Sequence, residues 1–496
     1  MLIITLDFAN LIIFFESTIC GDVEFFYNTP QFVVEYIVNN FIKILGRKNL
    51  FHYFCKKKKI KVNKSILKLA IPNIISNITI PLLGLVDMIL MGHLGSAIYI
   101  GAIALGGTIF SVLYSFFSFL RAGTTGFTAQ SLGNDDKTEI IYSLYRSICI
   151  GIPIILLILI LQIPIAKISS LLLDGSDEVK SLAITYFYVR IWAAPANILL
   201  YCLNGWFVGM QNTKIPMFIA ILINVMNIIL SFLFVIILKQ DVNGVALGTV
   251  LAQYCGLTLA IVLLIKNYKS YFVKINFQIL FNIEKIKRFF KVNTDFMIRS
   301  SLLIISIAFF TNQSAKLGDN ILAINMILLQ SFYIFSYFTD GFAYAGEALV
   351  GKFVGSNDKA NLQKVIRLLL LWGFAISIPF SILYALFPET FVRIISDNTE
   401  ILTEIQPYYI YMTIIPLITF AAFIWDGIYI GATASKAIRN TMIISTIFIF
   451  LPLWYILTPK FGNHGLWLAF LGFMIARGSV MTLLYKKNII NTVKNN

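Results

Sequence analysis

Apolar and polar positions follow one another along this chain in long blocks. Runs of twenty or more apolar residues are separated by short polar segments, and some runs, such as 215–238 and 242–265, contain no charged residue. A spanning α-helix needs about 20 largely apolar residues, whereas a membrane β-strand needs about 10. The pattern therefore predicts an all-α polytopic membrane protein. We expect twelve transmembrane helices, near 66–91, 98–120, 140–166, 180–205, 215–238, 242–266, 288–315, 320–345, 362–388, 405–430, 438–458 and 462–485.

Composition supports this interpretation and narrows the partners. The chain is 58% hydrophobic and 13% charged, with a mean hydropathy of +0.82. A soluble domain carries about 25% charged residues, so too little polar surface is present to face water all round. The net charge of +15 is explained by Lys and Arg in cytoplasmic loops, and we expect no nucleic-acid partner.

The charged residues between the spans predict the orientation. The middle loop carries seven basic residues between positions 266 and 291 against Glu284 alone, whereas the segments 174–178 and 389–404 are rich in Asp and Glu. Because cytoplasmic loops carry an excess of Lys and Arg, the basic loops are expected inside. With twelve spans, both termini then lie in the cytoplasm. The membrane is expected to be the plasma (inner) membrane.

The chain contains an internal repeat. Residues 204–214 resemble 426–436, and 133–137 resemble 355–359, with the same shift along the chain in both cases. We call this shift the repeat offset. Two halves of six spans each are typical of transporters, with the substrate bound between the halves near the midplane. The expected domains are an N-terminal extension of no assigned role (1–63), two six-helix bundles (64–266 and 288–487), a basic cytoplasmic linker between them (267–287) and a tail (488–496).

Each half also contains a Gly-xxx-Gly motif, Gly205/Gly209 in the first and Gly427/Gly431 in the second. Two glycines four residues apart lie on one face of a helix and let a second backbone approach closely. We interpret both motifs as helix-packing sites rather than substrate contacts.

Four ionisable residues inside or next to predicted spans stand out, because a charge in lipid costs about 2.5–3.5 kcal/mol on insertion scales and is a candidate for function. Asp87, toward the outer end of the first span, is predicted to bind the coupling ion, because a carboxylate in a low-dielectric cavity can take up a proton or pair with a cation. Capping or ion pairing at the water interface is the alternative. Arg299 is either a fixed counter-charge or extends to the inner surface. Asp340 and Glu347 lie toward the inner end of the eighth span, where structural pairing is expected.

Polar uncharged residues within the spans are weaker candidates for the substrate cavity. Asn224 and Asn227 are three apart and share one helix face, and Asn325 and Gln330 lie on the eighth span. Such side chains either line a cavity or form hydrogen bonds between helices, which is their commoner use.

Several segments together resemble a known family, namely 71–72, 85–95, 119–130, 293–299, 340–351 and 426–433. They are similar to the multidrug and toxic-compound extrusion (MATE) family, in its DNA-damage-inducible-F-like branch, over 64–487. The resemblance implies two six-helix bundles around a central cavity, and export of amphipathic, mostly cationic organic compounds in exchange for protons or sodium ions. It matches Asp87 and Arg299 to the branch's span-1 carboxylate and span-7 arginine. Ser231 stands where the branch often has Asp, which shifts the coupling role onto Asp87.

We therefore expect a non-enzymatic antiporter that works by alternating access, coupled to protons rather than sodium ions. It would act as a monomer in membrane lipid on small organic substrates, with no metal and no cofactor beyond the coupling ion. The alternative is a flippase for lipid-linked sugars of the same superfamily. Such a flippase would need a more cationic cavity, whereas Arg299 is one of few cations expected within the membrane. An intramembrane enzyme is disfavoured, because the acidic run Asp135, Asp136 and Glu139 lies at a short cytoplasmic turn, and its repeat partner 356–358 lacks the paired acids.

Overall fold

The computed structural model describes residues 57–92, 97–172 and 175–493. Residues 66–496 form one compact unit, and this unit is described below. The expected N-terminal extension 1–63 lies almost wholly outside the described residues. In α4 (Lys57–Gly92) the described side chains are those of residues 62–79, so Asp87 is placed on this helix by its backbone alone.

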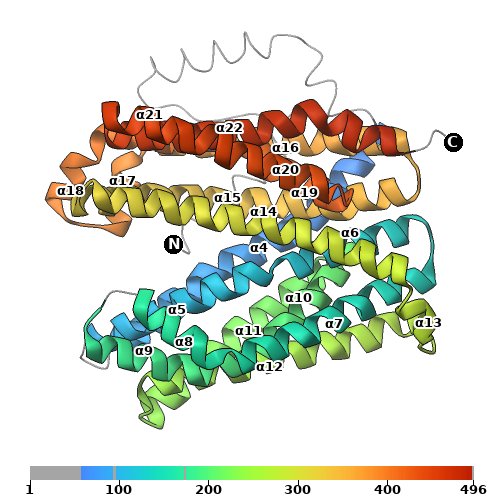
Figure 1. The fold of residues 1–496 in the computed structure, drawn as a ribbon, viewed down its shortest axis with the longest axis horizontal. Helices are drawn as coiled ribbons and strands as arrows, with labels where there is room; N and C mark the ends of the chain where they lie inside the picture. Colours follow the sequence, from blue (N-terminus) through green and yellow to red (C-terminus); the bar gives the residue numbers. More distant parts are fainter. Residues whose placement is uncertain (1–56, 93–96, 173–174, 494–496) are drawn as a thin grey trace, which may run out of the picture. The chain divides into compact units, whose positions relative to one another are not determined.

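Regular structure in the described ranges is helical, as expected (Figure 1). In the part of the chain that the structure describes, eleven helices are long and apolar enough to cross a membrane. They match the second to twelfth predicted spans, and the first predicted span falls within α4. The second and eighth spans run further than predicted, to Gly133 and Gly355. The other helices are α5 (Ala97–Phe117), α6 (Phe119–Gly133), α7 (Lys137–Ile160), α8 (Gln162–Leu172), α9 (Asp177–Arg190), α10 (Ala194–Gly209), α11 (Lys214–Phe232), α12 (Asp241–Tyr268), α13 (Phe277–Leu280), α14 (Ile283–Lys316), α15 (Asp319–Gly355), α16 (Lys359–Leu386), α17 (Pro388–Ile395), α18 (Thr399–Glu404), α19 (Tyr409–Gly431), α20 (Ser435–Ile443), α21 (Leu451–Phe461) and α22 (Asn463–Asn488).

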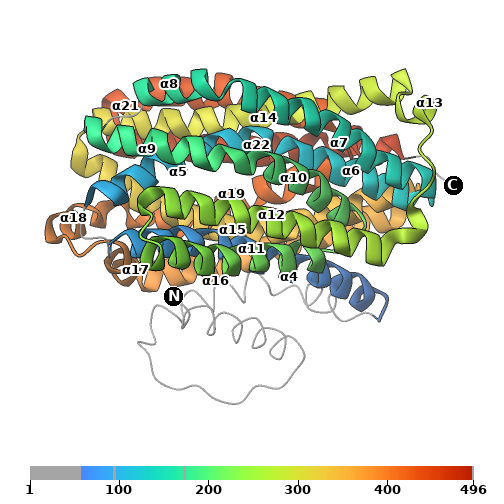
Figure 2. The same cartoon turned by 90° about the horizontal axis from the view of Figure 1, so that it is seen from below.

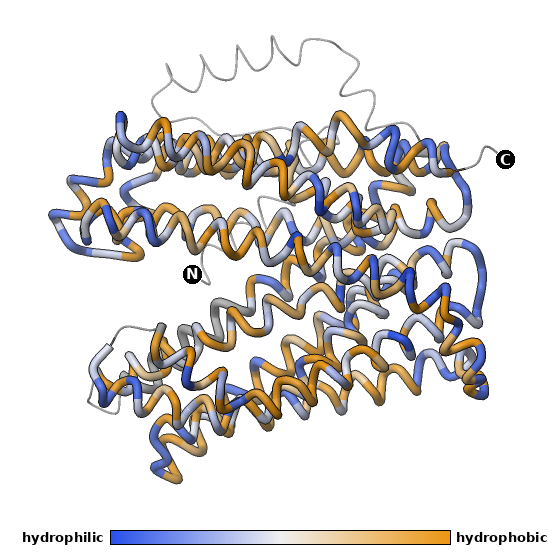
Figure 3. Tube along the Cα trace, in the orientation of Figure 1, coloured by the Kyte–Doolittle hydropathy of each residue, from blue (hydrophilic) through white to orange (hydrophobic). Residues whose placement is uncertain are grey.

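Hydropathy along the helices agrees with a membrane setting. Apolar residues dominate the middle of the long helices and polar residues gather toward their ends (Figure 3). Large apolar side chains remain exposed along these helices, among them Ile160, Phe218 and Phe448 at 74%, 55% and 66%. In a soluble protein such exposure over many helices would be an aggregation hazard, whereas in lipid it is the expected outer surface.

The short turns 134–136, 210–213, 356–358 and 432–434 lie at one end of the helices, together with the segment between α12 and α14. We call this the basic end, because most of the loop Lys and Arg residues lie there. The opposite end carries α17 and α18 (Figure 1). Two aspartate N-caps start helices at the basic end: Asp136 accepts from the Glu139 amide, and Asp358 from that of Asn361.

Both halves of the unit use the same turn geometry at the repeat offset. Asp135 and Asn357 have φ angles of 54° and 52°, and Gln211 and Thr433 have 60° and 51°. The two members of each pair are separated by the repeat offset. Positive φ is uncommon outside glycine, and its recurrence at matched positions shows that the sequence repeat is also a repeat of backbone shape.

The Gly-xxx-Gly motifs pack helices within each half, as predicted. A Cβ atom on Gly205 would press against the Arg121 carbonyl oxygen of α6, and one on Gly427 would collide with the Ala343 carbonyl oxygen of α15. These two contacts are again related by the repeat offset. The glycines therefore let α10 approach α6, and α19 approach α15, at backbone distance.

Candidate functional site

Six charged side chains meet deep among the helices. We call them the central cluster: Arg121 on α6, Arg299 on α14, Asp340 and Glu347 on α15, Asp426 on α19 and Arg477 on α22. Arg121 belongs to the first half and the other five to the second. With a rise of 1.5 Å per residue, these positions lie about 8 to 24 Å along their helices from the basic end. Three arginines face three carboxylates, so the formal charges balance.

The ion pair of Arg121 and Glu347 joins the two halves. Arg121 Nη1 donates to Glu347 Oε2 at 2.8 Å and Nη2 donates to Oε1 at 3.0 Å, which is the two-pronged geometry that arginine prefers with carboxylates. The Glu347 side chain is 1% exposed and that of Arg121 is 18% exposed. The guanidinium also lies 4.1 Å from the ring centroid of Tyr344. Loss of either partner would leave the other charge without a counter-charge in a largely buried site.

Asp426 organises the second-half side of the cluster. Its Oδ2 atom accepts a hydrogen bond from Arg477 Nη2 at 2.7 Å and another from Arg299 Nη2. Arg477 is fully buried. Among the described residues, Asp426 Oδ1 and the Nε atoms of both arginines have no hydrogen-bond partner. Buried polar atoms are usually paired, so this group keeps hydrogen-bonding capacity for a further polar ligand.

One face of α15 leads toward this cluster. Tyr333, Tyr337, Asp340 and Tyr344 are spaced four, three and four residues apart and are all half-buried, so they lie along one side of the helix. Asp340 is within electrostatic range of Arg299 and the other arginines of the cluster. The face presents three phenol rings and one carboxylate, which is a combination that attracts organic cations through ring faces and charge.

The two halves also meet at the basic end. A Cβ atom on Gly133 would collide with a backbone carbonyl of the second half, and one on Gly355 with a backbone carbonyl of the first. Gln130 Nε2 donates to the Gly431 carbonyl at 3.1 Å and to the Thr433 hydroxyl at 3.0 Å. The halves are therefore in backbone contact at this end, through positions that only glycine can occupy.

The structure brings three of the four predicted intramembrane charges together. Arg299, Asp340 and Glu347 all belong to the central cluster, and Arg299 and Glu347 are each bound to a partner of opposite charge. The pairing expected for Glu347 is thus observed, and Arg299 points to Asp426 rather than to the surface. Asp87 lies on α4, but its side chain falls outside the described residues, so its coupling role stays a prediction.

The predicted cavity residues are mostly bound between helices. Asn227 is fully buried and donates to Thr249 at 2.8 Å, and Asn325 is fully buried between partners on α14 and α22. Asn224 donates to the Thr79 carbonyl of α4 at 3.1 Å, while Gln330 is half-buried on α15. Hydrogen bonding between helices, the commoner use, therefore describes the three asparagines.

Sequence reasoning assigned no site role to Arg121, Asp426 or Arg477. Arg121 stood just past the predicted end of the second span at residue 120, whereas the helix continues to Gly133. The expectation of few intramembrane cations is wrong, because Arg121, Arg299 and Arg477 all lie within spans. Arg477 already lay inside the predicted twelfth span, 462–485, so its position in an apolar run was the available signal.

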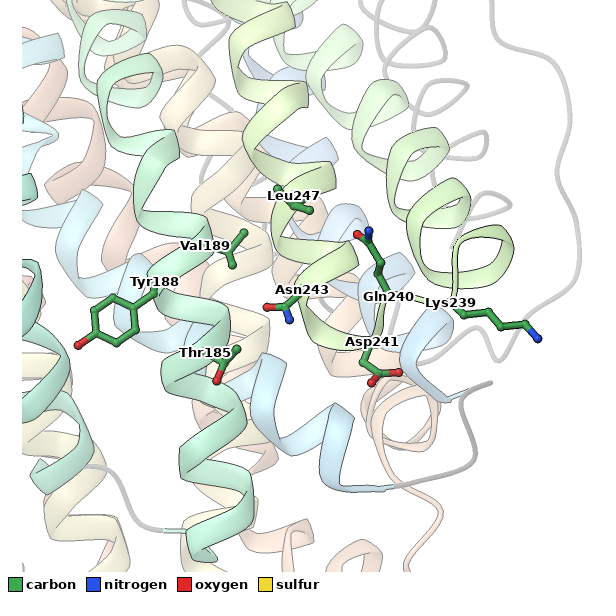
Figure 4. A pocket seen from close by; sticks show the side chains of 8 residues that line it. All are labelled: Thr185, Tyr188, Val189, Lys239, Gln240, Asp241, Asn243 and Leu247. Atoms are coloured by element: carbon green, nitrogen blue, oxygen red, sulfur yellow. The ribbon is translucent and has the colours of Figure 1, made fainter.

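A surface hollow of about 680 Å³ lies between α9 and the start of α12, away from the central cluster (Figure 4). Polar side chains of Lys239, Gln240 and Asp241 border one side, and Tyr188 and Val189 the other. Within the described ranges, no group of His, Cys, Asp and Glu has the arrangement of a metal site. The central cluster is therefore the strongest candidate site.

A known family model matches most of this chain. The family model described as MatE matches residues 72–233 and 277–456, which include Arg121, Arg299, Glu347 and Asp426. The chain belongs to the MATE family. MATE proteins are ion-coupled antiporters that move small molecules across membranes, so this chain is a membrane transporter rather than an enzyme.

Relatives and solved structures of MATE proteins agree over most of the chain. It is 32% identical to DNA damage-inducible protein F of Escherichia coli (strain K12), over 86% of this chain and 92% of that protein. It is 23% identical to the chloroplastic protein DETOXIFICATION 44 of Arabidopsis thaliana, over 84% and 81% of the two chains. The fold is similar to that of the Vibrio cholerae MATE transporter VcmN in its bent form, with a TM-score of 0.78, 18% identity and coverage of 88% and 99%.

Proposed function

We propose that this MATE transporter exports amphipathic, mostly cationic organic compounds in exchange for protons, by alternating access. The basic end would face the cytoplasm, in the plasma membrane, because its loops hold most of the Lys and Arg residues. The observation that supports the proposal best is the charge-balanced central cluster, which joins the halves and lies beside the tyrosine-lined face of α15.

The substrate class follows from the α15 face. An organic cation that lies along Tyr337 and Tyr344 would contact ring faces, and its charge would approach Asp340. Desolvated cation–π contacts contribute about 2 kcal/mol each, which suits many cations without selecting one shape. Pockets of this kind, mainly aromatic with a few fixed polar groups, are typical of small-molecule sites.

Protons are favoured over sodium ions by the state of the carboxylates. Both Glu347 oxygens and Asp426 Oδ2 are already bound by guanidinium groups, which leaves Asp426 Oδ1 as the one oxygen of these two carboxylates open to a metal cation. A proton needs one oxygen only. The coupling carboxylate remains Asp87 in this proposal, and Asp340 is the acidic residue of the α15 face.

The basic-end contacts supply the gate. In this structure the halves touch there through Gly133, Gly355 and Gln130, and further in through Arg121 and Glu347. Alternating access requires these contacts to break when the cavity opens toward the cytoplasm. Binding of a proton or a drug can drive that change only through a difference in affinity between the two states.

The flippase alternative would need a cationic cavity. Three arginines lie in the cluster, more than expected, but three carboxylates neutralise them. A phosphate-bearing lipid would find no excess positive charge among these six residues. We therefore retain the drug antiporter as the function that the site supports.

The direct test is efflux from proteoliposomes. A fluorescent organic cation is loaded into vesicles that contain the purified protein, and a proton or a sodium gradient is imposed separately. Export under the proton gradient alone supports the proposal, whereas export under the sodium gradient alone overturns the choice of ion. No export under either gradient, from protein shown to be folded, together with transbilayer movement of a lipid-linked oligosaccharide, would favour the flippase.

A further inference from the structure

The segment between the halves has an unusual surface. Residues 272–282 lie outside every candidate span, between Tyr271 and Ile283, yet large apolar side chains are exposed there: Phe272 by 39%, Ile275 by 47%, Phe277 by 68% and Phe281 by 52%. Lys274 and Lys287 are exposed beside them. We call these six residues the linker surface. Exposed aromatic groups outside the spans would face water unless something covers them.

The apolar part of this surface is ordered. Phe277 and Phe281, one helical turn apart on α13 and its C-cap, have parallel rings with centroids 6.2 Å apart and an interplanar angle of 5°. The side chain of Leu280, which precedes Phe281, is buried. The short helix therefore turns one side inward and presents stacked rings outward. In Figures 1 and 2, α13 lies at the rim of the basic end.

The first half holds the segment in place by its backbone. Arg146 on α7 is 4% exposed and donates from Nη2 to the Ile279 carbonyl at 3.0 Å and from Nε to the Leu280 carbonyl at 3.3 Å. The Asn276 amide donates to the Tyr142 hydroxyl at 2.7 Å. These bonds hold three backbone groups of the segment against the first half, and they do not use its exposed apolar side chains.

Glu139 links Arg146 to the start of α14, which follows the segment. Glu139 on α7 accepts from Arg146 at 2.5 Å and from Lys285 Nζ at 2.7 Å. At the repeat offset, the second half has Asn361 and Leu368 in place of Glu139 and Arg146. Glu139 and Arg146, which hold the segment and the start of α14, therefore have no counterparts at the matched positions of the second half.

We propose that the linker surface is a binding site for anionic phospholipids of the adjacent leaflet. Aromatic rings at the level of the lipid headgroups, with lysines beside them, are typical of interfacial membrane anchors. The longer stretch around the segment is also positive in charge, with seven Lys or Arg between 266 and 291 against Glu284, which matches an anionic lipid surface. Under the proposed orientation this is the cytoplasmic leaflet.

The test compares lipid compositions rather than transport. The purified full-length protein is placed in nanodiscs of phosphatidylcholine alone or of phosphatidylcholine and phosphatidylglycerol in equal parts, and its Tm is measured by tryptophan fluorescence. Phosphatidylglycerol is expected to raise the Tm of the wild type by about 2–4 °C. The rise should fall by at least half in the double variants Lys274→Gln/Lys287→Gln and Phe277→Ser/Phe281→Ser. Because each variant is compared with itself in the two lipids, a general loss of stability cancels.

The matched control removes the same charge elsewhere at the same end. Lys486 and Lys487, exposed at the end of α22, are replaced by Gln and should leave the rise intact. An equal loss in this control, or no difference between lipids in the wild type, would overturn the proposal. A dimer in detergent that disappears in Phe277→Ser/Phe281→Ser, with no lipid preference, would show self-association instead. The lipid preference is independent of drug export and of which face is cytoplasmic, so the two proposals fail separately.

Discussion

Glu347→Gln is the most informative perturbation of the gate. The substitution keeps the size of a side chain that is 1% exposed and removes its charge from Arg121. Breaking a buried ion pair costs about 3–5 kcal/mol. Arg121 is 18% exposed and keeps its contact with Tyr344, so we reduce this to about 2–3 kcal/mol. If the pair exists only while the basic end is closed, the ratio of closed to open molecules falls about 30- to 150-fold.

Spin labels at the basic end measure this ratio. Thr138 at the start of α7 and Ala360 at the start of α16 are both exposed and are related by the repeat offset. Each is changed to cysteine in a background where the five native cysteines are alanine. Distances between the labels are recorded by pulsed electron paramagnetic resonance in proteoliposomes. We expect one short-distance population in the reference protein and a dominant longer-distance population in Glu347→Gln.

Two further variants show whether the effect is specific to the gate. Asp295→Asn removes a carboxylate that is 3% exposed and bound to Arg439 at 2.6 Å, a pair that lies wholly within the second half. It should lower the Tm without changing the label distance. Arg121→Gln/Glu347→Gln leaves no unpaired charge and should recover part of the closed population. Unchanged distances in Glu347→Gln would refute the assignment of this pair to the gate.

Three other predictions use simpler readouts. Gly355→Ala should hold the basic end apart, because its Cβ would collide with the opposite backbone; we expect at least a tenfold loss of export and longer label distances, while Gly107→Ala, with nothing within 4 Å, should be neutral. Asp426→Asn should lower the free energy of unfolding by about 3 kcal/mol, because two buried arginines lose their shared partner; thermal denaturation against the exposed-site variant Asp241→Asn checks this. Asp87→Asn should abolish the stimulation of efflux by a proton gradient, and persistence of gradient-driven export would exclude Asp87 as the coupling carboxylate.

The fold could be predicted from sequence because its two main signals are local. A span is a run of apolar residues, so eleven described helices fall where the hydropathy pattern placed them. The repeat offset was readable because the same turns recur, and the shared positive φ of Asp135 and Asn357 gives the physical reason. Helix ends were less predictable: Gly133 and Gly355 terminate helices that continue past their apolar runs, supported by contacts with the opposite half.

The candidate site was less predictable because it depends on contacts between distant residues. Glu347 and Arg299 were found as isolated charges, but their partners are 226 and 127 residues away. Arg477 is flanked by apolar residues and gave no sign of pairing until Asp426 was placed beside it. A charge in a span marks a candidate; its partner is defined by packing that single-sequence patterns do not contain.

Charge balance in the central cluster implies a rule for exchange. A monovalent cation, proton or drug, that binds at one of the three carboxylates leaves the six side chains with one positive charge in excess, so two such ligands oppose each other even when they bind at different carboxylates. Linkage makes the effect mutual: a tenfold loss of drug affinity caused by a bound proton, about 1.4 kcal/mol, implies a tenfold loss of proton affinity caused by the drug. Under the proposed proton coupling, the number of protons exchanged would then depend on the charge of the drug rather than on its shape.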